Sequence, residues 1–136
     1  FVYCAETGEC QLTLGHTLEV TSCCFSHDGK YILTSGYLFA RIWNAADGTF
    51  IKKLMHTDSL VAKCAFSFDD KLVLSVSNIF VIISDIDCDD CHDFICALQG
   101  GHRSIVRDAC FSADGNRVVS ASSDETARIW DAQSGI

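Results

Sequence analysis

The chain has 136 residues, of which 49% are hydrophobic, and its formal net charge is −8 at pH 7. That length and hydrophobic fraction are sufficient for a buried core. The excess of acids argues against nucleic-acid binding, which depends on Lys and Arg neutralising phosphates. No run of 18 or more apolar residues occurs, so we expect no membrane-spanning helix.

Short runs of alternating apolar and polar residues, separated by turns rich in Asp and Gly, predict an all-β chain. Asp114-Gly115 is typical of a tight hairpin turn, because glycine tolerates a positive φ. In chain order, the predicted strands are Val20–Phe25, Tyr31–Thr34, Ala40–Trp43, Phe50–Leu54, Val61–Phe66, Leu72–Ser75, Phe80–Ile83, Phe94–Leu98, Val106–Phe111, Arg117–Ala121 and Thr126–Trp130.

Two pairs of motifs recur along the chain at similar spacing. Trp130-Asp131 follows His102 of a Gly-His pair by 28 residues, and Trp43-Asn44 follows His16 of another Gly-His pair by 27. A less regular copy begins at His56 and has Ile83 where the tryptophan is expected. The repeat length is about 40 residues, which is typical of blades with four strands each.

These motifs resemble the WD-repeat family of β-propellers. The resemblance implies a β-propeller fragment of about three and a half four-stranded antiparallel blades, whose strands we call a to d; closed propellers have roughly 4 to 8 blades, so we expect a larger propeller chain. The predicted parts are residues 1–14 (a partial blade with strands c and d), 15–55 (a blade with the Gly-His and Trp-Asn motifs), 56–99 (a degenerate blade with an acidic, Cys-rich c–d loop at 85–96) and 100–136 (a near-complete blade lacking strand d).

The resemblance also implies a hydrogen-bonded structural set of four residues in each regular blade. In the fourth part it falls on His102, Ser120 or Ser122, Asp124 and Trp130, whereas the second part keeps His16 and Trp43 but has Tyr37-Leu38 at the position of Ser123-Asp124. A Ser, a His and an Asp also form hydrolase triads. In this family the set joins strands, so we predict no catalytic residue and no enzyme activity.

The chain has nine cysteines, an odd number, and most of them fall within predicted strands. This distribution favours free thiols and an intracellular, cytoplasmic protein. The segment from Cys88 to His92 matches the C-x-x-C-H spelling of haem attachment, but its acidic loop offers no apolar pocket. We predict an ordinary insertion without a cofactor; the alternative is a structural zinc site made by Cys88, Cys91, His92 and Cys96.

By resemblance, the face formed by the b–c and d–a loops binds a protein or peptide, and the chain is a non-catalytic scaffold or adaptor. Tyr37 is the strongest candidate anchor, although it could instead fill a gap in its blade. The alternatives are a regulatory or targeting propeller of a larger enzyme whose catalytic domain lies elsewhere, and metal or redox sensing by the Cys88 to Cys96 loop. The candidate partner-binding residues are Leu18, Glu19, Tyr37, Asp58, Ser59, Asn78, Arg103, Ser104 and Ser123.

Overall fold

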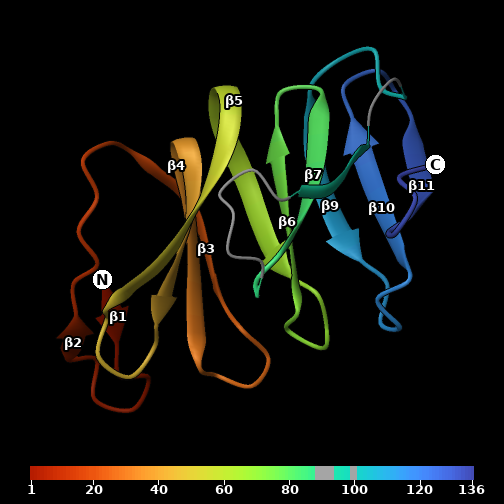
Figure 1. The fold of residues 1–136 in the computed structure, drawn as a ribbon. Coiled ribbons are helices and arrows are strands. Elements are labelled where there is room, and N and C mark those ends of the chain that lie inside the picture. Colours follow the sequence, from red (N-terminus) through yellow and green to blue (C-terminus); the bar gives the residue numbers. More distant parts are fainter. Residues whose placement is uncertain (88–93, 99–100) are drawn as a thin grey trace.

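The computed structural model describes residues 1–87, 94–98 and 101–136, with the side chains of 55–59 and 94–97 outside the description. In these residues the secondary structure consists of strands joined by turns and loops (Figure 1). The strands are β1 (Val2–Tyr3), β2 (Cys10–Leu12), β3 (Val20–Phe25), β4 (Tyr31–Asn44), β5 (Phe50–Phe66), β6 (Leu72–Ser77), β7 (Phe80–Asp85), β8 (Phe94–Leu98), β9 (Val106–Phe111), β10 (Arg117–Ser122) and β11 (Ala127–Asp131).

The strands form small antiparallel sheets that follow one another across the molecule, as Figure 1 shows from the red to the blue end. β1 pairs with β2, β3 to β8 pair consecutively, and β9, β10 and β11 form a three-stranded sheet. The all-β fold class is therefore confirmed, as a partial propeller. We call β3, β4 and the first half of β5 the first full blade, the remainder of β5 to β8 the middle blade, and β9 to β11 the last blade.

Two of these strands, β4 and β5, each merge two strands that the sequence predicts as separate. β4 merges the predicted strands b and c into a hairpin that reverses near Leu38, whose φ is 68°. The N–H of Ala45 donates to the carbonyl of Lys30 at 2.8 Å, which closes this hairpin. β5 pairs with β4 through Leu54 and with β6 through Cys64, so a single strand passes from one blade into the next.

The middle blade is covered on both faces, and the burial of its strands reflects this. In β6, Leu74 and Val76 pack into one hydrophobic cluster with Val118 and Trp130 of the last blade. Val73, the alternate residue, packs into a second cluster with Leu33 and Ile42 of the first full blade. The middle blade thus buries both of its faces against its neighbours, as expected for a repeat architecture.

The a–b turns also join neighbouring blades. Gly29 and Gly115 take a positive φ in two of these turns, at 73° and 72°, and Asp70 takes the same position in the middle blade with a φ of 56°. The Asp70 carboxylate accepts the backbone N–H groups of His27 and Asp28 from the preceding blade, each at 2.8 Å. An acid at a position that favours glycine therefore links two turns.

The described part of the chain contains no helix of the length and hydrophobicity that would be needed to cross a membrane.

The c–d connection of the middle blade lies between β7, which ends at Asp85, and β8, which starts at Phe94. The predicted bounds of this loop, 85–96, therefore end too late.

We predict that Asp70→Asn destabilises the protein by about 1–3 kcal/mol, because the amide offers one acceptor oxygen where two N–H groups must be satisfied. Asn tolerates the same positive φ, so backbone strain does not contribute. The measurement is urea unfolding. Asp87→Asn removes the same charge from an exposed side chain and is the control; equal midpoints for the two variants would contradict the role of Asp70.

Candidate functional site

Four side chains of the last blade form one continuous hydrogen-bonded chain. The indole N–H of Trp130 donates to Ser120 Oγ at 2.8 Å, and Ser120 Oγ lies 2.7 Å from His102 Nε2. His102 Nδ1 lies 2.9 Å from Asp124 Oδ2. A neutral imidazole satisfies every link if Nδ1–H donates to the carboxylate and Nε2 accepts the Ser120 hydroxyl proton. The set thereby joins strands b and c to the segment that precedes strand a.

Asp124 is the best-satisfied acceptor of this set. Its carboxylate accepts the hydroxyl of Thr126 at 2.6 Å and the backbone N–H of Arg103 at 2.9 Å, in addition to His102. These donors, with Thr126 first, hold the pKa of Asp124 well below the usual range for a carboxyl group. The carboxylate therefore stays ionised and orders the set.

Of the two predicted serines, the structure places only Ser120 in the set. Ser122 Oγ instead donates to the carbonyl of Ser104 at 2.9 Å and accepts the N–H of Asp124 at 3.1 Å. Side chains alternate between the two faces of a strand, but these two residues lie on one face, so alternation alone could not separate them. The difference arises at the end of β10, where the pairing with β9 is irregular.

The first full blade keeps the tryptophan contact but not the rest of the set. Trp43 donates its indole N–H to Thr34 Oγ1 at 2.8 Å, and the His16 ring packs 5.2 Å from the Trp43 ring. His16 Nε2 is buried without a hydrogen-bond partner. Arg41 approaches the other ring nitrogen, Nδ1, at 3.4 Å. Burial, followed by the charge of Arg41, lowers the pKa of His16, so its ring is neutral near pH 7.

Tyr37, and not Leu38, takes the position that Asp124 has in the last blade. Tyr37 precedes Trp43 by six residues, as Asp124 precedes Trp130, and the residues that follow them, Leu38 and Glu125, both have a φ of 68°. The prediction that aligned Leu38 with the aspartate was wrong by one residue. Counting from strand a aligns Leu38 with Asp124, but the first full blade has one residue fewer between strand a and Tyr37 than the last blade has before Asp124.

A similar shift occurs in the middle blade. The N–H of Ile86 donates to the carbonyl of Lys71 just as the N–H of Ala132 donates to that of Asn116. Since Trp130 lies two residues before Ala132, its counterpart is Ser84 and not Ile83 as predicted. Ile83 is fully buried in the hydrophobic cluster that Trp130 also joins.

Most of the predicted partner-binding residues that the structure describes lie along one edge of the blades, which we call the loop edge. The b–c turns and the starts of strands a meet there, because antiparallel strands exchange ends at each turn. Val106 N–H donates to Asn78 O, Ser123 N–H to Ile105 O, and Arg107 Nε to Ser123 Oγ. Of the predicted residues, the loop edge carries Leu18, Glu19, Tyr37, Asn78, Arg103, Ser104 and Ser123.

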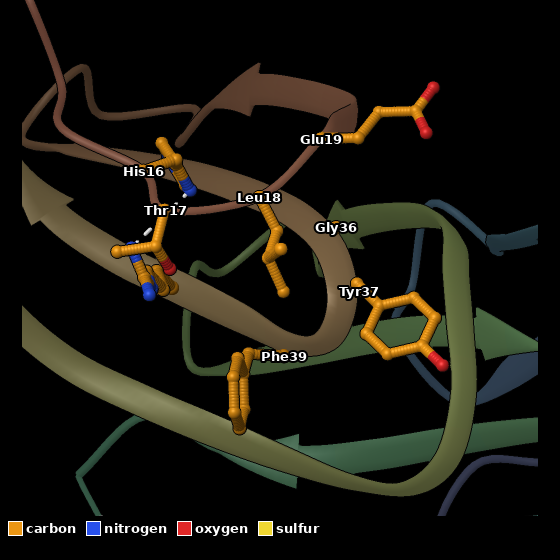
Figure 2. A pocket seen from close by; sticks show the side chains of 8 residues that line it. His16, Thr17, Leu18, Glu19, Gly36, Tyr37 and Phe39 are labelled. Atoms are coloured by element: carbon orange, nitrogen blue, oxygen red, sulfur yellow. Dashed lines mark hydrogen bonds between the residues drawn. The ribbon is translucent and has the colours of Figure 1, made fainter.

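A small pocket at the loop edge brings three of these residues together. It is lined by residues 16–19 and by Gly36, Tyr37, Phe39 and Arg41, so Leu18, Glu19 and Tyr37 border the same space (Figure 2). The turn needs glycine at position 36, because a Cβ there would lie 2.2 Å from the carbonyl oxygen of Glu19. Arg103, Ser104 and Ser123 lie instead around the Asp124 set.

Several predicted residues fall outside the description. Cys88, Cys91 and His92 lie outside the described residues, as do the side chains of Cys96, Asp58 and Ser59. Among the residues that are described, no three His, Cys, Asp or Glu side chains gather as a metal site would require. The zinc alternative stays untested.

Sequence reasoning missed Arg41, Thr34 and Asp70. Thr34 could have been found, because a buried tryptophan N–H needs an acceptor and Thr34 lies nine residues after Phe25, as Ser120 lies nine after Phe111. Arg41 and Asp70 gave no such signal, since both lie in segments where charged residues are usually solvated.

A scan against family models matches the WD domain, G-beta repeat, at residues 8–44 and 94–131. The chain belongs to the WD-repeat family. The middle segment between those matches is the one whose tryptophan position holds a serine.

Curated relatives agree with this assignment. The chain is 28% identical to guanine nucleotide-binding protein subunit beta-2 of Nicotiana tabacum, covering 93% of this chain and 35% of the relative. It is 29% identical to target of rapamycin complex subunit LST8 of Saccharomyces cerevisiae (76% and 34%) and to a bromodomain and WD repeat-containing protein of Dictyostelium discoideum (70% and 4%). The chain thus spans about a third or less of the length of these relatives.

We predict that Gly101→Ala destabilises the protein by about 1–3 kcal/mol, as overpacking of a filled site does. A Cβ at Gly101 would lie 2.0 Å from the Trp130 ring, so the ring must move away from its Ser120 contact. A Cβ at Gly15, the glycine of the other Gly-His pair, would have no other atom within 4 Å. Gly15→Ala should therefore have little effect on the unfolding midpoint, and equal losses for the two variants would contradict the packing argument.

A second prediction concerns acid. The lowered pKa of Asp124 means that its carboxylate stabilises the fold above the usual aspartate pKa, about 4, and that this contribution is lost as the pH falls below it. The stability difference between wild type and Asp124→Asn should be constant from pH 6 to 8 and shrink below about pH 4. Urea unfolding at each pH measures it; a difference that stays constant down to pH 2.5 would contradict the prediction.

Proposed function

We propose that the chain is a non-catalytic scaffold or adaptor module that binds a protein or peptide partner at its loop edge, in an intracellular setting. The observation that carries the proposal is Tyr37, which leaves 49% of its surface exposed at the position where the last blade has a structural acid. Leu18 is also exposed and borders the same pocket. Tyrosine is among the residues that most often act as anchors of protein interfaces.

The family and the relatives support this proposal. WD-repeat proteins generally act as interaction scaffolds, and one of the relatives is named as a subunit of a complex. The remaining loop-edge residues, Asn78, Arg103, Ser104 and Ser123, extend the proposed surface across the middle and last blades. Asp58 and Ser59 are included in the proposal from their sequence positions alone.

The geometry of the Ser, His and Asp set supports a structural and not a catalytic role. Ser120 is only 1% exposed, and its hydroxyl is held between Trp130 and His102 inside the blade. A nucleophile must lie where a substrate carbonyl can approach within about 3 Å. The hydroxyl has no such approach, so its bonds serve to join strands.

A second candidate is a regulatory or targeting propeller within a larger multidomain enzyme. The bromodomain-containing relative supports the multidomain part of this candidate, because this chain covers only 4% of that protein. The complete coding sequence decides between the two: a catalytic domain encoded on the same chain supports the second candidate, and its absence supports the adaptor.

We predict that Tyr37→Ala weakens capture of the partner by at least about tenfold, as loss of a hot-spot aromatic does, while the melting temperature stays unchanged. Phe68→Ala is the matched control, because Phe68 is 65% exposed in an a–b turn, at the opposite edge. The measurement is affinity capture with the full chain, followed by titration of the recovered partner. Unchanged affinity in Tyr37→Ala would remove Tyr37 from the interface.

A further inference from the structure

The pocket beside Tyr37 contains a hydrogen-bond donor whose acceptor in the last blade is a carboxylate. There, Asp124 accepts from His102 Nδ1 and from the backbone N–H of Arg103, the residue that follows the histidine. In the first full blade the equivalent acid is replaced by Tyr37. His16 Nδ1 accepts from the Arg41 guanidinium, so the donor that remains from this arrangement is the backbone N–H of the residue after His16, and its acceptor is missing.

Thr17 follows His16 as Arg103 follows His102. Within the described residues, the N–H of Thr17 donates to no acceptor, in contrast to that of Arg103. Thr17 is an exposed residue and lines the pocket, so a ligand in the pocket would contact this residue. In the last blade the equivalent N–H, that of Arg103, donates to a carboxylate oxygen of Asp124.

Arg41 supplies a positive charge at the same place. Its guanidinium lies 3.2 Å from the carbonyl of Gly15 and 3.4 Å from His16 Nδ1. None of the described carboxylates lies within ion-pair distance of it. Glu19 borders the pocket, but Figure 2 shows its carboxylate pointing away from His16.

A second cation reinforces the charge of this region. Lys53 of β5 is paired with Arg41 in the sheet, and its ammonium lies 3.6 Å from the centre of the Phe39 ring, which lines the pocket. The whole chain carries a net charge of −8, so this cationic region contrasts with the rest of the molecule. Its charge favours an acidic ligand.

We propose that this pocket binds the side-chain carboxylate of an Asp or Glu in the partner, which occupies the position left by the missing blade acid. The Arg41 guanidinium donates to both of its oxygens and the Thr17 N–H donates to one of them, and Tyr37 and Leu18 contact the adjacent residues of the partner. This inference rests on the proposed scaffold function and names the chemistry that the site recognises. A planar guanidinium matches a planar carboxylate in two parallel hydrogen bonds.

The test is a titration of the ¹⁵N-labelled chain with sodium acetate, against sodium chloride at equal ionic strength. We expect a saturable shift of the Thr17 amide with acetate only. Arg41→Gln should abolish the shift, and Arg41→Lys, which keeps the charge but not the planar fork, should weaken acetate binding at least fivefold. Tyr37→Asp supplies a carboxylate from within the chain and should also abolish the response, whereas Tyr37→Asn should retain it.

Three results would overturn the inference. An equal acetate shift in Arg41→Gln would mean that Arg41 does not bind the anion. A response to sodium phosphate with none to acetate would assign the pocket to phosphate. A response that appears only in Asp58→Asn would show that an acid of this chain already fills the pocket.

The proposed function and this inference fail separately. Partner capture that depends on Tyr37 without any acetate response keeps the scaffold and removes the carboxylate pocket. Acetate binding at Thr17 without a partner that depends on Tyr37 keeps the pocket and removes the scaffold surface.

Discussion

The hydrogen bond from a buried tryptophan N–H to a hydroxyl on strand b is the interaction on which the two regular blades depend. It measures 2.8 Å both in Trp130 to Ser120 and in Trp43 to Thr34. A large indole can fill the blade interior only if its single N–H finds an acceptor there. That requirement fixes strand c against strand b in both blades, and in the last blade His102 and Asp124 extend the same chain to the loop edge.

The middle blade shows what replaces this bond when it is lost. Ser84 stands at the tryptophan position, and the face of the middle blade toward the first full blade is packed by apolar residues such as Phe66 and Val73. Burial on both faces of β6 offsets the missing polar set, because apolar area removed from water stabilises without directional bonds. The loss of the sequence motif therefore left the sheet intact.

Local chemistry explains which parts of the fold the sequence predicts. β3, β8 and β9 have the predicted bounds, because alternation and Asp-Gly turns are encoded within a few residues. The predicted counterparts of Asp124 and Trp130 were each wrong by one residue, because Tyr37 and Ser84 hold those positions. A shortened turn allows two alignments, and only the pairing register decides between them. Contacts between blades, such as Lys63 with Asp108 at 2.8 Å, join residues 45 apart that separately resemble ordinary surface charges.

The presence or absence of the blade acid explains why we expect partner binding in the first full blade and not in the last blade, which is the most regular one. In the last blade, Asp124 satisfies the surrounding donors, so a partner gains nothing by approaching them. In the first full blade the acid is gone, while Thr17 N–H and the Arg41 guanidinium remain at the edge of an exposed pocket. Donors prepared for a carboxylate, but without one in their own blade, cost less to pair with a partner than groups that must first break internal bonds. Replacement of the blade acid by Tyr37 therefore leaves hydrogen-bond donors at the loop edge that can bind an acidic residue of a partner.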